Sequence, residues 1–190
     1  MSEAAGTVIF LNGTSSSGKT SIARELQQLA KAPYLHLSID AYLHQLPISV
    51  LTDGAILVRE LPKLMAGFNA SNAAIARAGN NIIVDTVWEQ RPWIDAAVAA
   101  FAGLDVYLVA VRCPLEVLEQ REQARGDRKV GLARLQYERV HAHGIDDTEV
   151  DTSVMTPRDA AAHILSRVQS GTAPTAFARL RLAAAPPKAN

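Results

Sequence analysis

Five short segments of the chain have the residue pattern of β-strands. In "TVIFL", "NIIVDTV" and "DVYLVAVRC" the apolar residues are almost continuous, which is typical of strands buried on both faces. "YLHLSID" and the shorter "TEVDTS" complete the set. The predicted strands cover residues 7–11, 34–40, 81–87, 105–113 and 148–153.

Between these strands, apolar residues recur with helical spacing. Ile22 and Leu26, for example, fall on one face of the first helical segment. The predicted helices cover residues 18–31, 41–79, 92–101, 114–125 and 157–171. We expect the second helical segment to be interrupted at Pro47, at the turn 52–54 and at Pro62, because proline removes a backbone donor.

The alternation of strands with helices predicts the fold class. It indicates an α/β fold in which a five-stranded parallel sheet is flanked by helices on both faces. We expect a single domain over residues 1–171. From Thr172 onward Ala, Pro and Thr dominate, so residues 172–190 are predicted to be a C-terminal tail with a short helical stretch at 177–182.

Composition excludes several classes of protein. The 190 residues are 48% apolar and 20% charged, as in ordinary globular proteins, and the formal net charge is zero. Zero net charge argues against nucleic-acid or anionic-membrane binding. A single cysteine, Cys113, excludes an internal disulfide and a Cys-rich metal site, and we expect it to be a small core residue. Without a signal sequence or a membrane-length apolar run, the expected location is the cytoplasm.

One motif carries specific chemistry. Gly13-x4-Gly18-Lys19-Thr20 follows the first strand, opens the first helix and fits the P-loop pattern. Its backbone N–H groups and the helix N-terminus would bind the phosphates of ATP. We expect Lys19 to reach the β- and γ-phosphates and the Thr20 hydroxyl to bind Mg²⁺. The predicted ATP-binding residues are Gly13, Thr14, Ser15, Ser16, Ser17, Gly18, Lys19, Thr20 and Ser21.

Two aspartates lie at the ends of predicted strands, where parallel sheets bind their ligands. Asp85, in the third strand, is the expected second Mg²⁺ residue beside Thr20; the alternative is an acid that only caps a loop. Asp40, after the second strand, is the candidate base that accepts the proton of an attacking hydroxyl. It could instead cap the following helix, and the two roles are compatible.

Three arginines form a candidate phosphate clamp. Arg121 and Arg125 share a helix face, and Arg128 follows the break at Gly126. Arginines that close over a transferring phosphoryl group stabilise its charge, so these three are predicted to belong to a lid. The alternative is a solvated helix face that pairs with Glu119 and Glu122.

Other residues are weaker candidates. His141 and His143 are too sparse for a zinc site, but they could line the pocket. Tyr42, Leu43, Leu46 and Trp88 are candidates for an apolar wall around the acceptor, and core packing explains them equally well.

Several segments together resemble one known family. "VIFLNGTSSSGKTSIARELQ", "SIDAYL", "IIVDTV", "VRCPLEVLEQREQARGDR" and "VHAHG…EVDTS" resemble the chloramphenicol phosphotransferase family in order and spacing over residues 8–168. The resemblance implies a P-loop kinase fold with a lid at about 121–140. It also implies that Asp40 is the base and that Arg121, Arg125 and Arg128 are lid arginines. The chain departs from the family pattern at Thr86, where a second acid is frequent.

The expected activity is therefore ATP-dependent transfer of the γ-phosphate to a hydroxyl of a small molecule, such as chloramphenicol or another antibiotic. Two alternatives remain open. One is a P-loop kinase of a nucleotide, a sugar acid or adenylylsulfate, and the other is an ATP-hydrolysing switch without an acceptor. The expected partners are ATP, Mg²⁺ and a small hydroxylated acceptor. The oligomeric state, including a homo-oligomer, is left open.

Overall fold

The computed structural model describes residues 4–125 and 131–184. Within these ranges the strands form one five-stranded sheet in the order β2-β3-β1-β4-β5. All four strand pairs are parallel, which confirms the predicted α/β class. The strands are β1 Val8–Asn12, β2 Tyr34–Ser38, β3 Asn81–Thr86, β4 Val106–Arg112 and β5 Thr148–Asp151.

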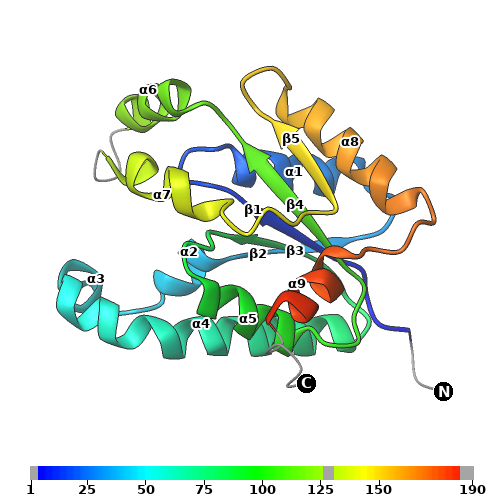
Figure 1. Ribbon diagram of the computed structural model, residues 1–190, viewed down its shortest axis with the longest axis horizontal. Coiled ribbons are helices and arrows are strands. Elements are labelled where there is room, and N and C mark those ends of the chain that lie inside the picture. Colours follow the sequence, from blue (N-terminus) through cyan, green and yellow to red (C-terminus); the bar gives the residue numbers. More distant parts are fainter. Residues whose placement is uncertain (1–3, 126–130, 185–190) are drawn as a thin grey trace, which may run out of the picture.

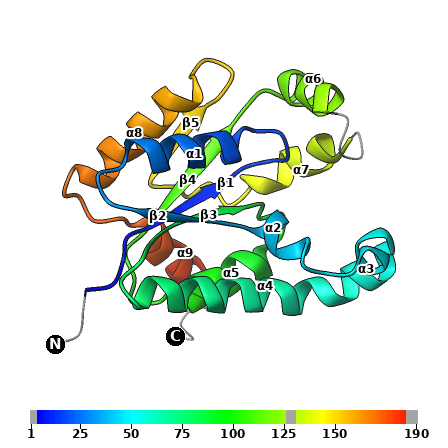
Figure 2. The same cartoon turned by 180° about the vertical axis from the view of Figure 1, so that it is seen from behind.

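Helices cover both faces of the sheet. They are α1 Lys19–Leu29, α2 Ile39–Leu43, α3 Ile48–Thr52, α4 Gly54–Arg77, α5 Arg91–Ala100, α6 Leu115–Arg125, α7 Leu132–Val140, α8 Pro157–Gln169 and α9 Ala176–Ala184. Helices α1 and α8 lie on one face, and α4, α5 and α9 lie on the other (Figures 1 and 2). Helices α6 and α7 lie beyond the carboxyl ends of the strands (Figure 1).

Strand β1 shows why the sheet has a core on each side. Its first four residues are fully buried and point alternately to opposite faces. Val8 and Phe10 pack with the layer of α4, α5 and α9, whereas Ile9 and Leu11 pack with α1 and α8. Continuous apolar runs are required in such a strand because neither face meets water.

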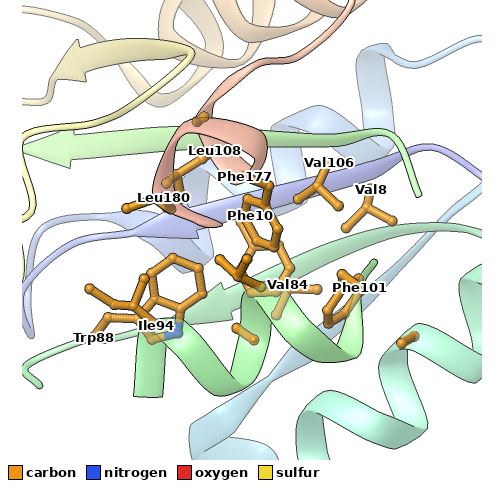
Figure 3. Close-up of a cluster of buried hydrophobic side chains, with 14 of the residues drawn as sticks. Val8, Phe10, Val84, Trp88, Ile94, Phe101, Val106, Leu108, Phe177 and Leu180 are labelled. Carbon is orange, nitrogen blue, oxygen red and sulfur yellow. The ribbon is translucent and has the colours of Figure 1, made fainter. Parts of the chain in front are cut away.

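The C-terminal segment differs from the predicted tail. Residues 176–184 form α9, in which Ala176, Phe177 and Leu180 are buried in the core. Figure 3 shows Phe177 and Leu180 in this cluster. The ring centroid of Phe177 lies 5.4 Å from that of Phe10. The carboxylate of Asp147 accepts hydrogen bonds from the N–H groups of Thr175, just before this helix, and Ala176, its first residue. The short helix expected at 177–182 is therefore present, but composition did not show that it packs into the core, because only a few large apolar residues on one face hold it there. Residues 185–190 of the predicted tail lie outside the described residues.

Helix α4 corrects a second expectation. Two of the predicted interruptions separate α2, α3 and α4, but α4 runs without a break from Gly54 to Arg77 with Pro62 inside it. Asp53 caps its N-terminus by accepting hydrogen bonds from two backbone N–H groups. Pro62 and Val58, four residues earlier, are both exposed. Water can therefore reach the carbonyl that proline leaves without a helical donor, which lowers the free-energy cost of the missing hydrogen bond.

Candidate active site

A cavity of about 420 Å³ lies beyond the carboxyl ends of the strands. Segments that follow all five strands contribute to it, as expected for a ligand site in a parallel sheet. The cavity is lined by Ser15, Ser16, Gly18, Lys19, Thr20, Ser21, Ile39, Asp40, Asp85, Val87, Arg121, Ala124, Thr152, Met155 and Pro157. It thus brings most of the predicted loop residues together with both aspartates and with one of the three arginines.

The loop between β1 and α1 is built to expose its backbone. A Cβ atom on Gly13 would lie 2.5 Å from the carbonyl oxygen of Val111, so a side chain cannot fit there. Gly18 has a φ of 92°, and Ser16 adopts the left-handed region with a φ of 62°, which is uncommon for a residue with a side chain. Within the described residues, the buried hydroxyls of Ser16 and Ser17 have no hydrogen-bond partner. Strained backbone with unsatisfied donors fits a cradle for a phosphate chain.

Lys19 folds over this loop. Its ammonium group donates hydrogen bonds to the carbonyl oxygens of Gly13, at 3.0 Å, and Thr14, at 2.8 Å. It also lies 3.8 Å from Oδ1 of Asp85. A positive charge is therefore fixed at the entrance of α1, beside the place where phosphates would lie.

Asp85 is a nearly buried anion. Burial raises the pKa of its carboxyl, but Lys19, followed by His36 and Thr20, outweighs burial and holds that pKa below its usual value. The Thr20 hydroxyl donates a hydrogen bond of 2.9 Å to Oδ2 of Asp85. Nε2 of His36, on β2, lies 3.5 Å from the same oxygen. His36 was not predicted as a site residue, because the sequence does not show that β2 and β3 are neighbours.

Thr20 and Asp85 suit the predicted Mg²⁺. They offer a hydroxyl and an ionised carboxylate side by side, and oxygen is the ligand that Mg²⁺ prefers. The described part of the chain contains no cluster of three or more His, Cys, Asp or Glu residues that could hold a metal by itself. An ion held by one or two protein oxygens, completed by water and phosphate, matches such a donor set.

Asp40 lines the same cavity from the β2 edge of the sheet. It is half-buried and lies in the first turn of α2, whose N-cap is Ser38. Asp40 is therefore not the cap of that helix. A carboxylate in this turn is favoured by the helix dipole, and Asp40 shares the cavity with residues of the phosphate loop.

Of the three arginines predicted to belong to a lid, Arg121 is the one that the structure places in the cavity. Its guanidinium donates hydrogen bonds to Oγ1 of Thr152, at 2.9 Å, and to the carbonyl oxygen of Thr152, at 2.7 Å. The Thr152 hydroxyl in turn donates to the carbonyl oxygen of Ser17. Arg121 is thereby tied to the phosphate loop. Arg125 ends α6 with a side chain that is not described, and Arg128 lies outside the described residues.

Gln136 is a contact to the loop that sequence reasoning missed. Residues 132–140 form α7, and the Gln136 side chain accepts a hydrogen bond of 2.7 Å from the N–H of Ser15. The signal was present in the sequence. Ala133, Gln136 and Val140 share the buried face of α7 at helical spacing, with a glutamine among apolar neighbours.

Of the two alternatives for Trp88, an acceptor wall or core packing, the structure confirms core packing. This side chain is fully buried, and its ring packs against Phe10 and Phe177 in the core (Figure 3). Tyr42 and Leu43 pack against the same core, and none of the four proposed wall residues lines the cavity. The apolar part of the lining comes instead from Ile39, Val87, Ala124, Met155 and Pro157.

The two histidines and the cysteine lie away from this cavity. His141 lines a separate cavity beside Arg112, and burial lowers its pKa to about 4. His143 lies 3.3 Å from the side chain of Asn12. Cys113 is buried with Leu118 and Ala133, which confirms it as a core residue.

Comparison with known proteins identifies the family. A sequence profile described as "Chloramphenicol phosphotransferase-like protein" matches residues 6–169. The chain belongs to the chloramphenicol phosphotransferase-like family. Two curated relatives in Mycobacterium tuberculosis, from strains CDC 1551 and H37Rv, are both named "Putative O-phosphotransferase". Each is 32% identical over 198 residues, covering 93% of this chain and 88% of the relative.

Solved structures agree on the fold. A sugar kinase from Janibacter sp. HTCC2649 superposes with a TM-score of 0.67 at 19% identity, covering 88% of this chain and 96% of that one. The APS kinase CysC of Mycobacterium tuberculosis gives a TM-score of 0.64 at 18% identity, covering 87% and 99%. The chain thus has the P-loop kinase fold. Within the described ranges, no helix combines the length and apolar character needed to cross a bilayer.

Proposed function

We propose that this protein is an ATP-dependent phosphotransferase that moves the γ-phosphate to a hydroxyl group of an uncharged small molecule. Chloramphenicol and other hydroxylated antibiotics are the first acceptors to test. The observation that carries the proposal is one cavity that holds a phosphate loop, the Thr20–Asp85 pair and the carboxylate of Asp40. Membership of a phosphotransferase family supports it.

The strand order suggests how the substrates lie. The phosphate loop follows the central strand β1, Asp40 follows the edge strand β2, and Met155 and Pro157 follow the opposite edge strand β5. Phosphates on the loop would therefore have the acceptor on the side of Asp40. The nucleobase would lie on the other side, against the apolar surfaces of Met155 and Pro157.

The chemistry follows from this layout. Asp40 would accept the hydroxyl proton while the acceptor oxygen forms a bond to the γ-phosphorus and the bond to the ADP oxygen breaks. Lys19 and Arg121 would stabilise the charge that spreads over the transferring group. Thr20 and Asp85 would hold Mg²⁺, which when bound neutralises phosphate charge. The residues mostly position the reactants, as is usual in phosphoryl transfer.

The lining favours an acceptor without charge. Among the described lining residues the cations are Lys19 and Arg121, and both already donate hydrogen bonds to the protein. A sugar acid, a nucleotide or adenylylsulfate would bring a further anion into the cavity, and an anion needs a cation to compensate its desolvation. A neutral alcohol matches the apolar residues of the lining better.

The deciding experiment is acceptor-dependent turnover. Purified protein with ATP and Mg²⁺ is given a panel of neutral hydroxylated antibiotics, chloramphenicol included, and of anionic alcohols. Mass spectrometry then identifies any phosphorylated product. We expect a phosphate ester of a neutral acceptor. Strong ATP hydrolysis that no acceptor increases would instead indicate a nucleotide-hydrolysing switch.

Asp40→Asn tests the proposed base. We expect this variant to bind ATP with wild-type affinity but to lose roughly 10²–10⁴ in kcat, because the amide cannot accept the proton. Calorimetry measures the affinity and product formation measures kcat. Asp105→Asn, at an exposed aspartate before the amino end of β4, is the matched control and should turn over normally. Normal turnover in Asp40→Asn would remove the residue from the mechanism.

A further inference from the structure

Gln136 connects α7 to the phosphate loop by two hydrogen bonds of opposite direction. Its Oε1 accepts from the N–H of Ser15 at 2.7 Å, and its Nε2 donates to Oε1 of Glu89 at 2.9 Å. Gln136 is only 5% exposed. A backbone N–H can only donate and an ionised carboxylate can only accept, so this orientation of the amide is the one that satisfies both partners.

The helix that carries Gln136 is itself held in place. The side chain of Asn12, at the end of β1, donates to the carbonyl oxygen of Val140 and accepts from the N–H of Trp88, both at 2.9 Å. Arg139 lies 3.8 Å from the other oxygen of Glu89. Helix α7 is therefore held against the segments that end β1 and follow β3, which fixes the backbone position of Gln136.

The peptide that Gln136 holds is also the one that contacts Lys19. The N–H of Ser15 and the carbonyl of Thr14 belong to a single planar peptide unit, in which the two groups point in opposite directions. Gln136 binds the N–H, and the Lys19 ammonium donates to the carbonyl at 2.8 Å. A rotation of this peptide would break both hydrogen bonds together.

We propose that Gln136 is a positioning residue that orients the Thr14–Ser15 peptide and, through it, the ammonium group of Lys19. The inference rests on the proposed function, since it assigns Lys19 to the phosphates of ATP. The positioning by Gln136 also depends on Glu89, because that carboxylate fixes which end of the Gln136 amide faces Ser15. Phosphate binding at the loop is thus set partly by two residues that do not line the cavity.

The hydrogen-bond directions provide a sharp test by exchange. Gln136→Glu can still accept from Ser15, but it sets a second carboxylate against Glu89 with no donor between them. Glu89→Gln alone removes the carboxylate that can only accept the hydrogen bond from the Gln136 amide, so the orientation of that amide is no longer fixed. In the double variant Q136E/E89Q, the carboxylate at position 136 accepts both from Ser15 and from the new amide at position 89. Both hydrogen bonds are restored, and the net charge equals that of the wild type.

The first measurement is the affinity for Mg²⁺ and a non-hydrolysable ATP analogue without acceptor, by calorimetry on the full chain. We expect Q136E to bind about tenfold more weakly, since losing a buried hydrogen bond has an effect of this order. We expect Q136E/E89Q to return to within about threefold of the wild type. Gln123→Glu, on the exposed surface of α6, adds the same charge as a control and should bind normally.

The second measurement separates positioning from general destabilisation. Well below the melting temperature, we expect Q136E to raise KM for ATP and to leave KM for the acceptor unchanged. A variant that is only less folded would lose active enzyme and leave both KM values unchanged. Analogue affinity in Q136E equal to the wild type, or a double variant no better than Q136E, would overturn the inference. A wild type that binds no analogue would overturn the proposed function itself.

Discussion

At the scale of single residues, two aspartates show how surroundings decide ionisation. Asp85 is almost buried, yet Lys19 beside it keeps its carboxyl ionised, which suits a residue proposed to hold a cation. Asp146 is the opposite case. Burial raises its pKa to about 6, although Arg112 lies 3.9 Å away, and its Oδ1 has no hydrogen-bond partner within the described residues. Two carboxyls that each have a cation at nearly the same distance therefore differ in ionisation, because desolvation competes with the attraction of the cation.

Asp146 predicts a pH dependence of stability. Its pKa is about 6 in the folded chain and near 3.8 in the unfolded one, so between these values the folded state binds more protons. The folded protein therefore loses stability as the pH rises from about 4 to 6. Asp146→Asn cannot ionise and should be spared this loss. Urea unfolding should show the stability of the variant, relative to the wild type, rising over that range and levelling above it. A difference that is independent of pH would contradict the prediction.

At the scale of elements, α9 shows that a short helix can belong to the core. Phe177 and Leu180 face the aromatic cluster beneath the sheet, and Arg91 donates a hydrogen bond to the carbonyl oxygen of Leu180. The other face of the helix is exposed, with Leu182 at 76%. A helix of this length is marginal in isolation, so packing on the sheet, not helical propensity, holds it.

Phe177→Ala tests this role of α9. We expect it to lower the free energy of unfolding by about 3–5 kcal/mol, the usual cost of removing a buried aromatic side chain. Leu182→Ala, at the exposed position of the same helix, should change it by less than about 0.5 kcal/mol. Denaturant unfolding measures both values. Equal, small effects would show that α9 does not contribute to the core in solution.

The elements also differ in how far sequence could predict them. The strands were predictable because burial on both faces requires continuous apolar runs such as "VIFL" and "VYLVAV", which are uncommon in other short elements. The interruption predicted at Pro62 was wrong. The free-energy cost of a proline inside a helix depends on whether water reaches the carbonyl four residues earlier, and only the folded helix shows that this part of its surface is exposed. Helix α7 was not predicted, because residues 121–140 were expected to form a lid and the apolar positions of its buried face are few.

At the scale of the whole molecule, the candidate site is where the strand order brings distant segments together. Asp40 and Pro157 are far apart in the chain and follow opposite edge strands, yet they line one cavity. The phosphate loop lies between them, tied to the loop after β5 through Thr152 and to α7 through Gln136. A nucleotide bound here would contact most of these segments at once, so its binding should stabilise the entire fold.

Unfolding measured with and without bound nucleotide tests whether binding stabilises the entire fold. Mg²⁺ with a non-hydrolysable ATP analogue at about 100 times its Kd should add about 2.7 kcal/mol to the free energy of unfolding. We expect chelation of Mg²⁺ to reduce that gain in the wild type. In Thr20→Val, which lacks the hydroxyl beside Asp85, chelation should change little. Thr52→Val, at an exposed threonine of α3, should behave as the wild type does. A gain that chelation leaves intact in the wild type would contradict the proposed metal site.

The sequence by itself determined the parallel α/β architecture, the phosphate loop and its lysine and threonine, because each of these depends on residues close together in the chain. Only the tertiary structure decided which side chains surround Asp85, that Gln136 reaches Ser15 from 121 positions away, and that Trp88 belongs to the core. The physical reason is the strand order, in which β1 lies between β3 and β4. Neighbours in such a sheet are not neighbours in the chain, and no local pattern encodes their contacts.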